Sequence, residues 1–298
     1  MLWWFRVLVV ILSVCLFSEI QLHAQKASCT FKTWLLNPAN PNNPREQVGG
    51  VNDNRTVVGS AHYPNQTPHL VGFVHYSNGT INYWHPANAK FSFLNERNNL
   101  GNTVGSYVDT LKIGHAVYLH GSTTTLIVHP KAAHHSTDLV AINNLNTLLG
   151  SYVDSSGVWH TFKRRSNGTF LAVPNFPGAK LTGPGGFNDN GVVVGDYLNP
   201  GDCCGISHGF IYRNNAFAKL NYRNIPNTNT ELVGIDNNGV IVGNHYSTGF
   251  LFKNGAFKDI IGPNGAEVTV RGISANGIIT GDMWISGSGS HGFTATCQ

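Results

Sequence analysis

The chain has 298 residues, of which only 11% are charged and 34 are glycine, and its formal net charge at pH 7 is +4. The positive charge is small and spread out, and the one basic run, residues 163–165, is short, so the sequence does not predict a nucleic-acid partner. The many glycines and the scarcity of helix-forming residues favour an all-β protein rich in turns.

Residues 1–24 have the composition of a secretory signal peptide. Arg6 supplies a positive charge, and the apolar run at residues 8–17 is too short for a comfortable membrane span. We expect cleavage after Ala24, which leaves residues 25–298 as the mature chain without a stable membrane span. The predicted location is therefore secreted, periplasmic or at the cell surface.

A motif of the form Gly-Ile-Asn-x-Asn-Gly-x-Ile-Val-Gly recurs six times in the mature chain. It is clearest at residues 186–195, 234–243 and 272–281, and the closing glycines of successive copies lie 38 to 48 residues apart. A period in this range is typical of propellers and solenoids. No helical periodicity appears after residue 25, which argues against a helical solenoid.

Each repeat is predicted to form four short antiparallel strands, A to D. In the fifth repeat, strand A (230–235) is followed by an Asx-x-Asn-Gly turn, and a second tight turn at 254–255 leads to strand D (256–261). Each connection from strand D to the next strand A holds a proline, which cannot donate to a sheet ladder. Four antiparallel strands in about 45 residues form a propeller blade, so we predict a six-bladed β-propeller.

The first and last repeats predict how the ring closes. The sixth repeat ends after strand C, and the missing strand D lies at residues 29–35, which we expect to pair with the C-terminal blade at 268–298. In this alignment Cys29 and Cys297 both occupy turn positions, and we therefore predict a disulfide between them. A cross-link that closes so long a loop is nominally worth about 4–5 kcal/mol.

Two further cysteines, Cys203 and Cys204, are adjacent in the sequence. An exported protein can form disulfides, so these residues are predicted to be either a vicinal disulfide or two free thiols. A metal site would need two more ligands, and the sequence does not supply them at a recognisable spacing.

The third strand of most repeats starts with a histidine followed two residues later by an apolar residue. These segments resemble the HAF-family extracellular repeats of bacteria, and they stand at 115–117, 160–162, 208–210 and 291–293. The first and fifth repeats lack the histidine. The resemblance covers essentially the whole mature chain and implies an exported repeat protein with propeller-like blades. It implies no catalytic residues.

The repeated polar residues have structural explanations. The Asx residue that opens each A–B turn is expected to cap its own backbone, and the histidine of strand C is expected to hydrogen-bond a neighbouring blade. Functional residues are expected where the repeats differ, in the B–C and D–A connections that share one face of the ring. The candidate ligand-binding residues on that face are Asp109, Asp154, Asp202, His245, Tyr246 and Trp284.

These candidates suit a carbohydrate or a peptide. A metal site at His129, His134, His135 and Asp138 is disfavoured because this loop spacing has no fixed geometry, so we predict neither a metal nor a cofactor. No nucleophile elbow, zinc motif or phosphate loop is present, and no mature glutamate pairs with an aspartate by sequence.

We therefore predict a monomeric, exported, non-catalytic binding module. The alternatives are a glycan-directed hydrolase or lyase with its site at the channel mouth, and a structural surface repeat protein.

Overall fold

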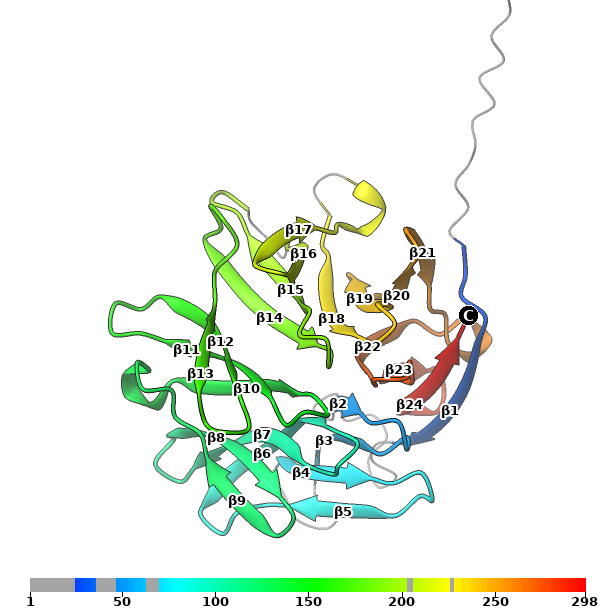
Figure 1. Cartoon of the computed structure of the whole chain (residues 1–298). Helices are drawn as coiled ribbons and strands as arrows, with labels where there is room; N and C mark the ends of the chain where they lie inside the picture. The colour runs from blue at the N-terminus through cyan, green and yellow to red at the C-terminus, as the bar shows by residue number, and fades with distance from the viewer. Residues whose placement is uncertain (1–24, 36–46, 63–69, 203–205, 226–227) are drawn as a thin grey trace, which may run out of the picture.

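The computed structural model describes residues 25–35, 47–62, 70–202, 206–225 and 228–298. Six sheets of four antiparallel strands stand around a central axis, as Figure 1 shows. The predicted all-β, six-bladed propeller is thus confirmed. Within the described residues, no helix is long and apolar enough to cross a membrane.

Blades 1 to 3 follow one another along the chain. From the innermost strand to the outermost, they consist of β2 (Gln47–Val51), β3 (Val57–His62), β4 (Leu70–His75) and β5 (Ile81–Trp84); of β6 (Ala89–Arg97), β7 (Thr103–Asp109), β8 (Gly114–His120) and β9 (Thr123–Leu126); and of β10 (Thr137–Ile142), β11 (Leu148–Val153), β12 (Trp159–Arg164) and β13 (Phe170–Val173).

Blades 4 to 6 consist, in the same order, of β14 (Leu181–Phe187), β15 (Val193–Leu198), β16 (His208–Arg213) and β17 (Ala216–Lys219); of β18 (Glu231–Ile235), β19 (Ile241–His245), β20 (Thr248–Lys253) and β21 (Ala256–Asp259); and of β22 (Val268–Ile273), β23 (Ile279–Ile285), β24 (Gly289–Cys297) and β1 (Cys29–Leu35). Three short 3₁₀ helices lie in D–A connections, η1 (Ala133–His135), η2 (Tyr222–Asn224) and η3 (Pro263–Gly265).

The two ends of the described chain close the ring. Strand β1 pairs antiparallel with β24 in a register that sets Cys29 opposite Cys297, and a disulfide joins these two residues. The N-terminal strand therefore supplies the outermost strand of blade 6, as the phase of the repeats predicted. With this closure, blade 6 has four strands, like every other blade.

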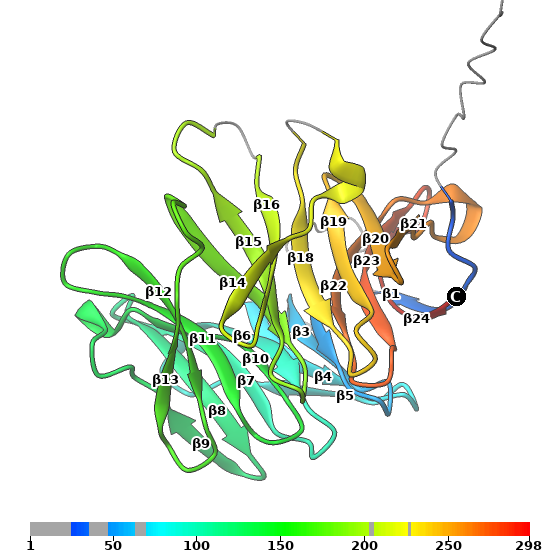
Figure 2. The same ribbon diagram turned by 45° about the horizontal axis from the view of Figure 1, so that its top comes forward.

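Two faces of the ring result from this connectivity, and the hairpins can be followed in Figure 2. We call the face with the A–B and C–D turns the A–B face, and the face with the B–C loops and D–A connections the B–C face. On the A–B face, the first residue of each turn caps its own backbone. For example, Asn188 Oδ1 accepts from the Val192 amide over 3.0 Å, and Asp236 Oδ1 accepts from the Val240 amide over 2.7 Å.

Glycines allow the innermost strands to approach one another. A Cβ on Gly185 would lie 1.9 Å from the carbonyl oxygen of Leu232 in the next blade. A Cβ on Gly195, which closes the fourth repeat, would lie 2.1 Å from the Gly183 carbonyl oxygen and 3.0 Å from the Phe210 ring. The inner strands therefore pack backbone against backbone, which keeps the axial channel narrow.

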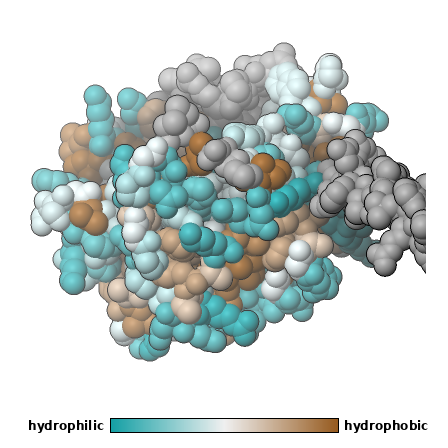
Figure 3. Space-filling view, turned by 90° about the horizontal axis from the view of Figure 1, so that it is seen from above, coloured by the Kyte–Doolittle hydropathy of each residue, from teal (hydrophilic) through white to brown (hydrophobic). Residues whose placement is uncertain are grey.

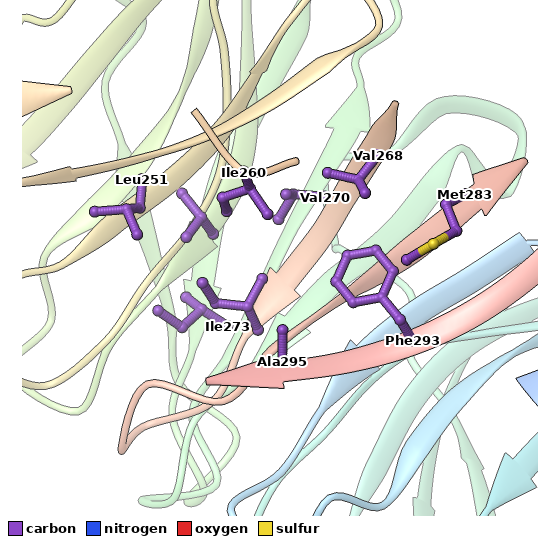
Figure 4. Packing of buried hydrophobic residues seen from close by; sticks show 10 residues of the cluster. Leu251, Ile260, Val268, Val270, Ile273, Met283, Phe293 and Ala295 are labelled. Carbon is purple, nitrogen blue, oxygen red and sulfur yellow. The ribbon is translucent and has the colours of Figure 1, made fainter. Parts of the chain in front are cut away.

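Apolar side chains fill the space between blades. In Figure 4, Phe293 lies among Val268, Val270 and Met283 of blade 6, and Leu251 and Ile260 come from blade 5. Most blades bury a phenylalanine of strand C completely. Phe162, Phe210 and Phe293 stand two positions after the strand C histidine, and Phe250 holds the same place in blade 5, where threonine replaces the histidine. On the surface shown in Figure 3, apolar residues form several small groups among hydrophilic ones.

Candidate functional site

Three B–C loops are held by the same arrangement of an aspartate and a histidine. Asp109 Oδ1 accepts from the amides of Leu111 and Ile113, over 2.8 and 2.9 Å, and its Oδ2 lies 3.0 Å from His115 Nε2. The His115 ring also stacks on Tyr107, with 4.6 Å between the ring centres. The carboxylate thus fixes both the loop and the first side chain of the following strand.

Blade 3 repeats this arrangement, whereas blade 4 keeps the aspartate–histidine contact and its aspartate accepts from the Asn199 amide, which precedes it. Asp154 Oδ1 accepts from the Ser156 and Val158 amides, and its Oδ2 lies 2.7 Å from His160 Nε2. Asp202 lies 3.2 Å from His208 Nε2. The Ser156 hydroxyl and His160 hold the pKa of Asp154 below its ordinary value, and His115 does the same for Asp109.

These contacts correct one prediction. The strand C histidines were expected to tie neighbouring blades together, but His115, His160 and His208 bind the aspartate of their own B–C loop. The reason is positional, because each histidine pairs with a tyrosine near the end of strand B, where the loop carboxylate stands. The predicted ligand contacts of Asp109, Asp154 and Asp202 remain predictions, and each carboxylate is already engaged within its own blade.

Blade 5 has a different B–C connection. His245 stacks on Tyr222, with 4.3 Å between ring centres, and its Nδ1 lies 3.0 Å from both the Thr228 hydroxyl and the Asn229 carbonyl oxygen. Its neighbour Tyr246 forms the tight turn with a φ of 51° and is 57% exposed. Blade 5 therefore presents an aromatic side chain to solvent above a histidine that its neighbours hold in place.

Two tryptophans are exposed at the same face. Trp284 near the end of β23 is 54% exposed, and Trp159 at the start of β12 is 48% exposed. Sequence reasoning missed Trp159, because it directly precedes the repeated histidine and fits the pattern of a strand residue. A weak signal was available, since the position before that histidine is small or polar in blades 2 and 4, where it is the exposed Gly114 and the buried Ser207.

A pair of acidic residues lies between blades 4 and 5. Burial, and then the negative charge of Glu231, raises the pKa of Asp196 to about 7. This pair was not evident from the sequence, where no glutamate was expected to pair with an aspartate. The partners belong to different blades, Asp196 on β15 and Glu231 on β18, so their approach follows from how the blades pack and not from spacing in the sequence.

Glu96 is the second acidic group that the ring encloses. It stands on β6, where four of the other five inner strands have glycine (Gly50, Gly186, Gly234 and Gly272) and the remaining one has Ala141. Its carboxylate lies against Gly50 of blade 1 and accepts from the Arg97 amide over 2.9 Å. Burial raises the pKa of Glu96 to about 8. The side chain borders a polar axial cavity of about 40 Å³ on the A–B face.

The disfavoured metal cluster does not form in the structure. His129 is buried and stacks on Tyr152, with 3.8 Å between ring centres, and its Nδ1 accepts from the Lys131 amide. Over the part of the chain that the structure describes, no group of three or more His, Cys, Asp or Glu residues is placed to hold a metal ion. Cys203 and Cys204 lie outside the described residues.

Comparison with known proteins identifies the architecture but no family. No protein-family model matches the chain, and no curated protein matches it in sequence. Among solved structures, virginiamycin B lyase from Staphylococcus aureus aligns with a TM-score of 0.52 at 10% identity, covering 90% of this chain and 99% of the lyase. A gluconolactonase from Xanthomonas campestris aligns with a TM-score of 0.51 at 12% identity, covering 93% of this chain and 98% of that one. Likeness at this level of identity shows a shared propeller fold.

Proposed function

We propose that the protein is an exported, non-catalytic carbohydrate-binding module of the HAF-repeat type, and that its ligand meets the B–C face. The observation that carries this proposal is the exposure of Trp159, Tyr246 and Trp284, one each from blades 3, 5 and 6, at the same face of the ring. An aromatic ring offers an apolar face and, in tryptophan and tyrosine, a hydrogen-bonding edge. A pyranose ring has the complementary combination of C–H faces and hydroxyl groups.

The support beneath these side chains favours binding to a preformed surface. Trp159 follows the loop that Asp154 holds through two backbone amides, and Tyr246 stands above His245, which is itself fixed by three neighbours. A side chain on a rigid base loses less conformational entropy when it binds. Export accords with the Cys29–Cys297 disulfide, because such bonds persist in oxidising compartments.

A glycan array with the chain from residue 25 onward tests the proposal. We expect binding to at least one glycan class, and a loss of affinity of about tenfold or more in Trp159→Ala, Tyr246→Ala or Trp284→Ala. Leu145→Ala is the matched control, because Leu145 is 62% exposed but lies in an A–B turn on the other face. Absence of glycan binding, or equal affinity in all three variants and the wild type, would overturn the proposal.

The Asp196–Glu231 pair favours a second candidate, a hydrolase that acts on glycosides or lactones. A carboxyl group with a pKa of about 7 beside a second carboxyl group can exchange a proton at neutral pH, as general acid–base catalysis requires. Release of product from a panel of glycosides and lactones, compared between the wild type, Asp196→Asn and Glu231→Gln, separates the two functions. Turnover that both substitutions abolish would establish the hydrolase.

A further inference from the structure

Two neighbouring grooves on the A–B face have the same construction. The groove between blades 4 and 5, the 4/5 groove, has a volume of about 540 Å³, and the 5/6 groove has a volume of about 420 Å³. The apolar floor of the 5/6 groove includes Val240, Leu251 and Ile279. The equivalent positions in the 4/5 groove are Val192, Ile211 and Ile241. Each groove also holds one basic residue from strand C and the glycine of the next A–B turn.

At the interface between blades 3 and 4, the equivalent space holds a lysine of the protein itself. Lys163 occupies the position of Ile211 and Leu251, and its Nζ donates to the carbonyl oxygen of Gly191 over 3.1 Å. Gly191 is the turn glycine equivalent to Gly277. The alkyl stem of Lys163 thus crosses the region that forms the floor of the open grooves, and the ammonium group reaches the turn backbone.

Arginines stand at one further interface and beside another. Arg55 stands where four of the other five turns have glycine, and its guanidinium donates to the hydroxyl groups of Thr294 and Thr296, over 3.1 and 2.7 Å. In blade 2, Arg97 stands at the position of Ile235 and Ile273, which line the two open grooves, and it donates to the Thr103 hydroxyl of its own blade over 2.8 Å. Cationic side chains therefore cross two of the six interfaces, and Arg97 occupies an equivalent position beside a third.

Between blades 2 and 3 the corresponding side chains are aromatic. Tyr118 stacks on His120, with 6.1 Å between ring centres, and His120 Nδ1 lies 2.8 Å from Asn102 Oδ1. The remaining two interfaces are the 4/5 and 5/6 grooves, in which Ile211 and Leu251 are too short to span the same distance. Side chains of the protein thus show what the groove accommodates, namely an alkyl chain that ends in a cationic or aromatic polar group.

The 5/6 groove differs from the 4/5 groove by a carboxylate. Asp236 lines it at the turn position where blades 1 to 4 have asparagine, and Asp236 is only 2% exposed. Its Oδ1 caps the turn, and its Oδ2 lies 3.4 Å from where a Cβ on Gly277 would stand, so this oxygen faces the wall of the groove. Burial raises the pKa of this carboxyl group, and a hydrogen bond from the Asn238 side chain acts against that rise. A cationic partner would favour the ionised form in the same way.

Two lysines also line this groove, and their positive charge opposes a bound cation. Lys253 and Lys258 are the basic residues of its wall. In the repeat, Lys253 is equivalent to Arg165 of blade 3. Arg165 lies close to Lys163, and its charge lowers the pKa of Lys163, although burial of Lys163 lowers that pKa more. The Lys163 amino group nevertheless reaches the Gly191 carbonyl oxygen over 3.1 Å, so a basic residue at this flanking position does not exclude an amine head group from the space.

We propose that the 5/6 groove binds a lysine or arginine side chain of a partner polypeptide. The alkyl stem lies over Val240, Leu251 and Ile279, and the cationic head meets Asp236 and the backbone of the turn at Gly277. This site is on the face opposite to the proposed carbohydrate surface, so the two functions are independent of each other.

Titration with small amino-acid derivatives, followed by ¹⁵N chemical shifts, tests this site. The probes are N-acetyl-lysine methylamide and N-acetyl-arginine methylamide, with N-acetyl-norleucine methylamide as the uncharged isostere of the lysine stem. We expect saturable shifts at the Val240 and Gly277 amides with the cationic probes, and binding at least about tenfold weaker with norleucine. Equal response to all three probes, or no shift at these amides, would overturn the proposal.

Three variants locate the response. Asp236→Asn introduces the residue of four other turns and is expected to weaken binding about tenfold or more, whereas Leu251→Lys recreates Lys163 and is expected to abolish it. Because Leu251 is buried and its variant can fail to fold, the double variant Asn143→Asp with Lys163→Ile provides a gain of function. This double variant opens the interface between blades 3 and 4 and is expected to add shifts at Gly191. Unchanged binding in Asp236→Asn would refute the assignment.

Discussion

The side-chain amide of Asn188 donates to the backbone carbonyl of Asp236 over 2.9 Å and joins the A–B turns of blades 4 and 5. Asn52 and Asn98 make the same bond to the following blade, over 3.2 and 2.9 Å. Asp236 has no side-chain N–H group, so it cannot donate this bond to blade 6. Burial also raises the pKa of its carboxyl group. The turn of blade 5 is therefore less favourably connected than those of blades 1 and 4.

We predict that Asp236→Asn stabilises the protein. Asparagine retains the oxygen that caps the turn and adds a donor toward blade 6, and one such hydrogen bond contributes about 1 kcal/mol. The free energy of unfolding, measured with urea at pH 7, is expected to rise by about this amount. Asn188→Asp, which removes the same donor one blade earlier, is the matched control and is expected to lower it. A decrease in stability for Asp236→Asn would contradict the role assigned to these amides.

The disulfide gives a second prediction. Cys29 and Cys297 are 268 residues apart, so their bond restricts almost the whole unfolded chain. We expect the double variant Cys29→Ser with Cys297→Ser to lose about 4 kcal/mol of unfolding free energy. Unfolding of the wild type in a reducing buffer should reproduce that loss, and reductant should not affect the variant. Equal stability of the oxidised and reduced wild type would show that the pairing of β1 with β24 is sufficient to close the ring.

Most of the architecture was predictable because the repeat encodes it locally. The motif that ends at Gly195 specifies a strand, a capped turn and a second strand. Its glycine is required because the Gly183 carbonyl and the Phe210 ring occupy the space of a Cβ. The position of β1 was predictable for the same reason, since an incomplete final repeat and an isolated initial strand complete one blade.

The candidate site was less predictable because its contacts cross between blades or depend on exposure. Spacing along the chain could not predict that Asp196 and Glu231 interact, because these two residues are neighbours only where blades 4 and 5 pack together. Nor could it show that Asp109 and Asp154 would be occupied by backbone amides and a histidine. The exposure of Trp284, which was chosen as a residue near a variable loop, follows from its position near the end of β23.

The loop carboxylates lead to a prediction about local stability. In Asp154→Ala, the amides of Ser156 and Val158 lose their common acceptor, and we expect their hydrogen exchange to become faster while the rest of blade 3 is unchanged. The Ile113 amide, which Asp109 holds in the same way in blade 2, is the internal control. Unaltered protection of Val158 would mean that the loop is ordered without the carboxylate, and Trp159 would then owe its position to strand pairing alone.

Glu96 gives the last prediction, a dependence of stability on pH. Because burial raises its pKa from 4.5 to about 8 in the folded protein, the folded state binds more protons than the unfolded state between these values. Stability must then fall as pH rises through this window. Asp196 contributes with the same sign up to its pKa of about 7, so a single pH profile of the wild type does not isolate Glu96.

The difference between Glu96→Gln and the wild type does isolate it. Glutamine cannot ionise, and its oxygen can still accept from the Arg97 amide. We expect the variant to gain stability relative to the wild type progressively from about pH 5 to pH 8, reaching about 4–5 kcal/mol above pH 8. Urea unfolding at pH 5, 7 and 9 measures this difference. A difference in unfolding free energy that is constant across the three pH values would show that the Glu96 carboxyl group is solvated in the axial cavity. The Glu96 side chain would then contribute to stability only by filling the space that the glycines of the other blades leave open.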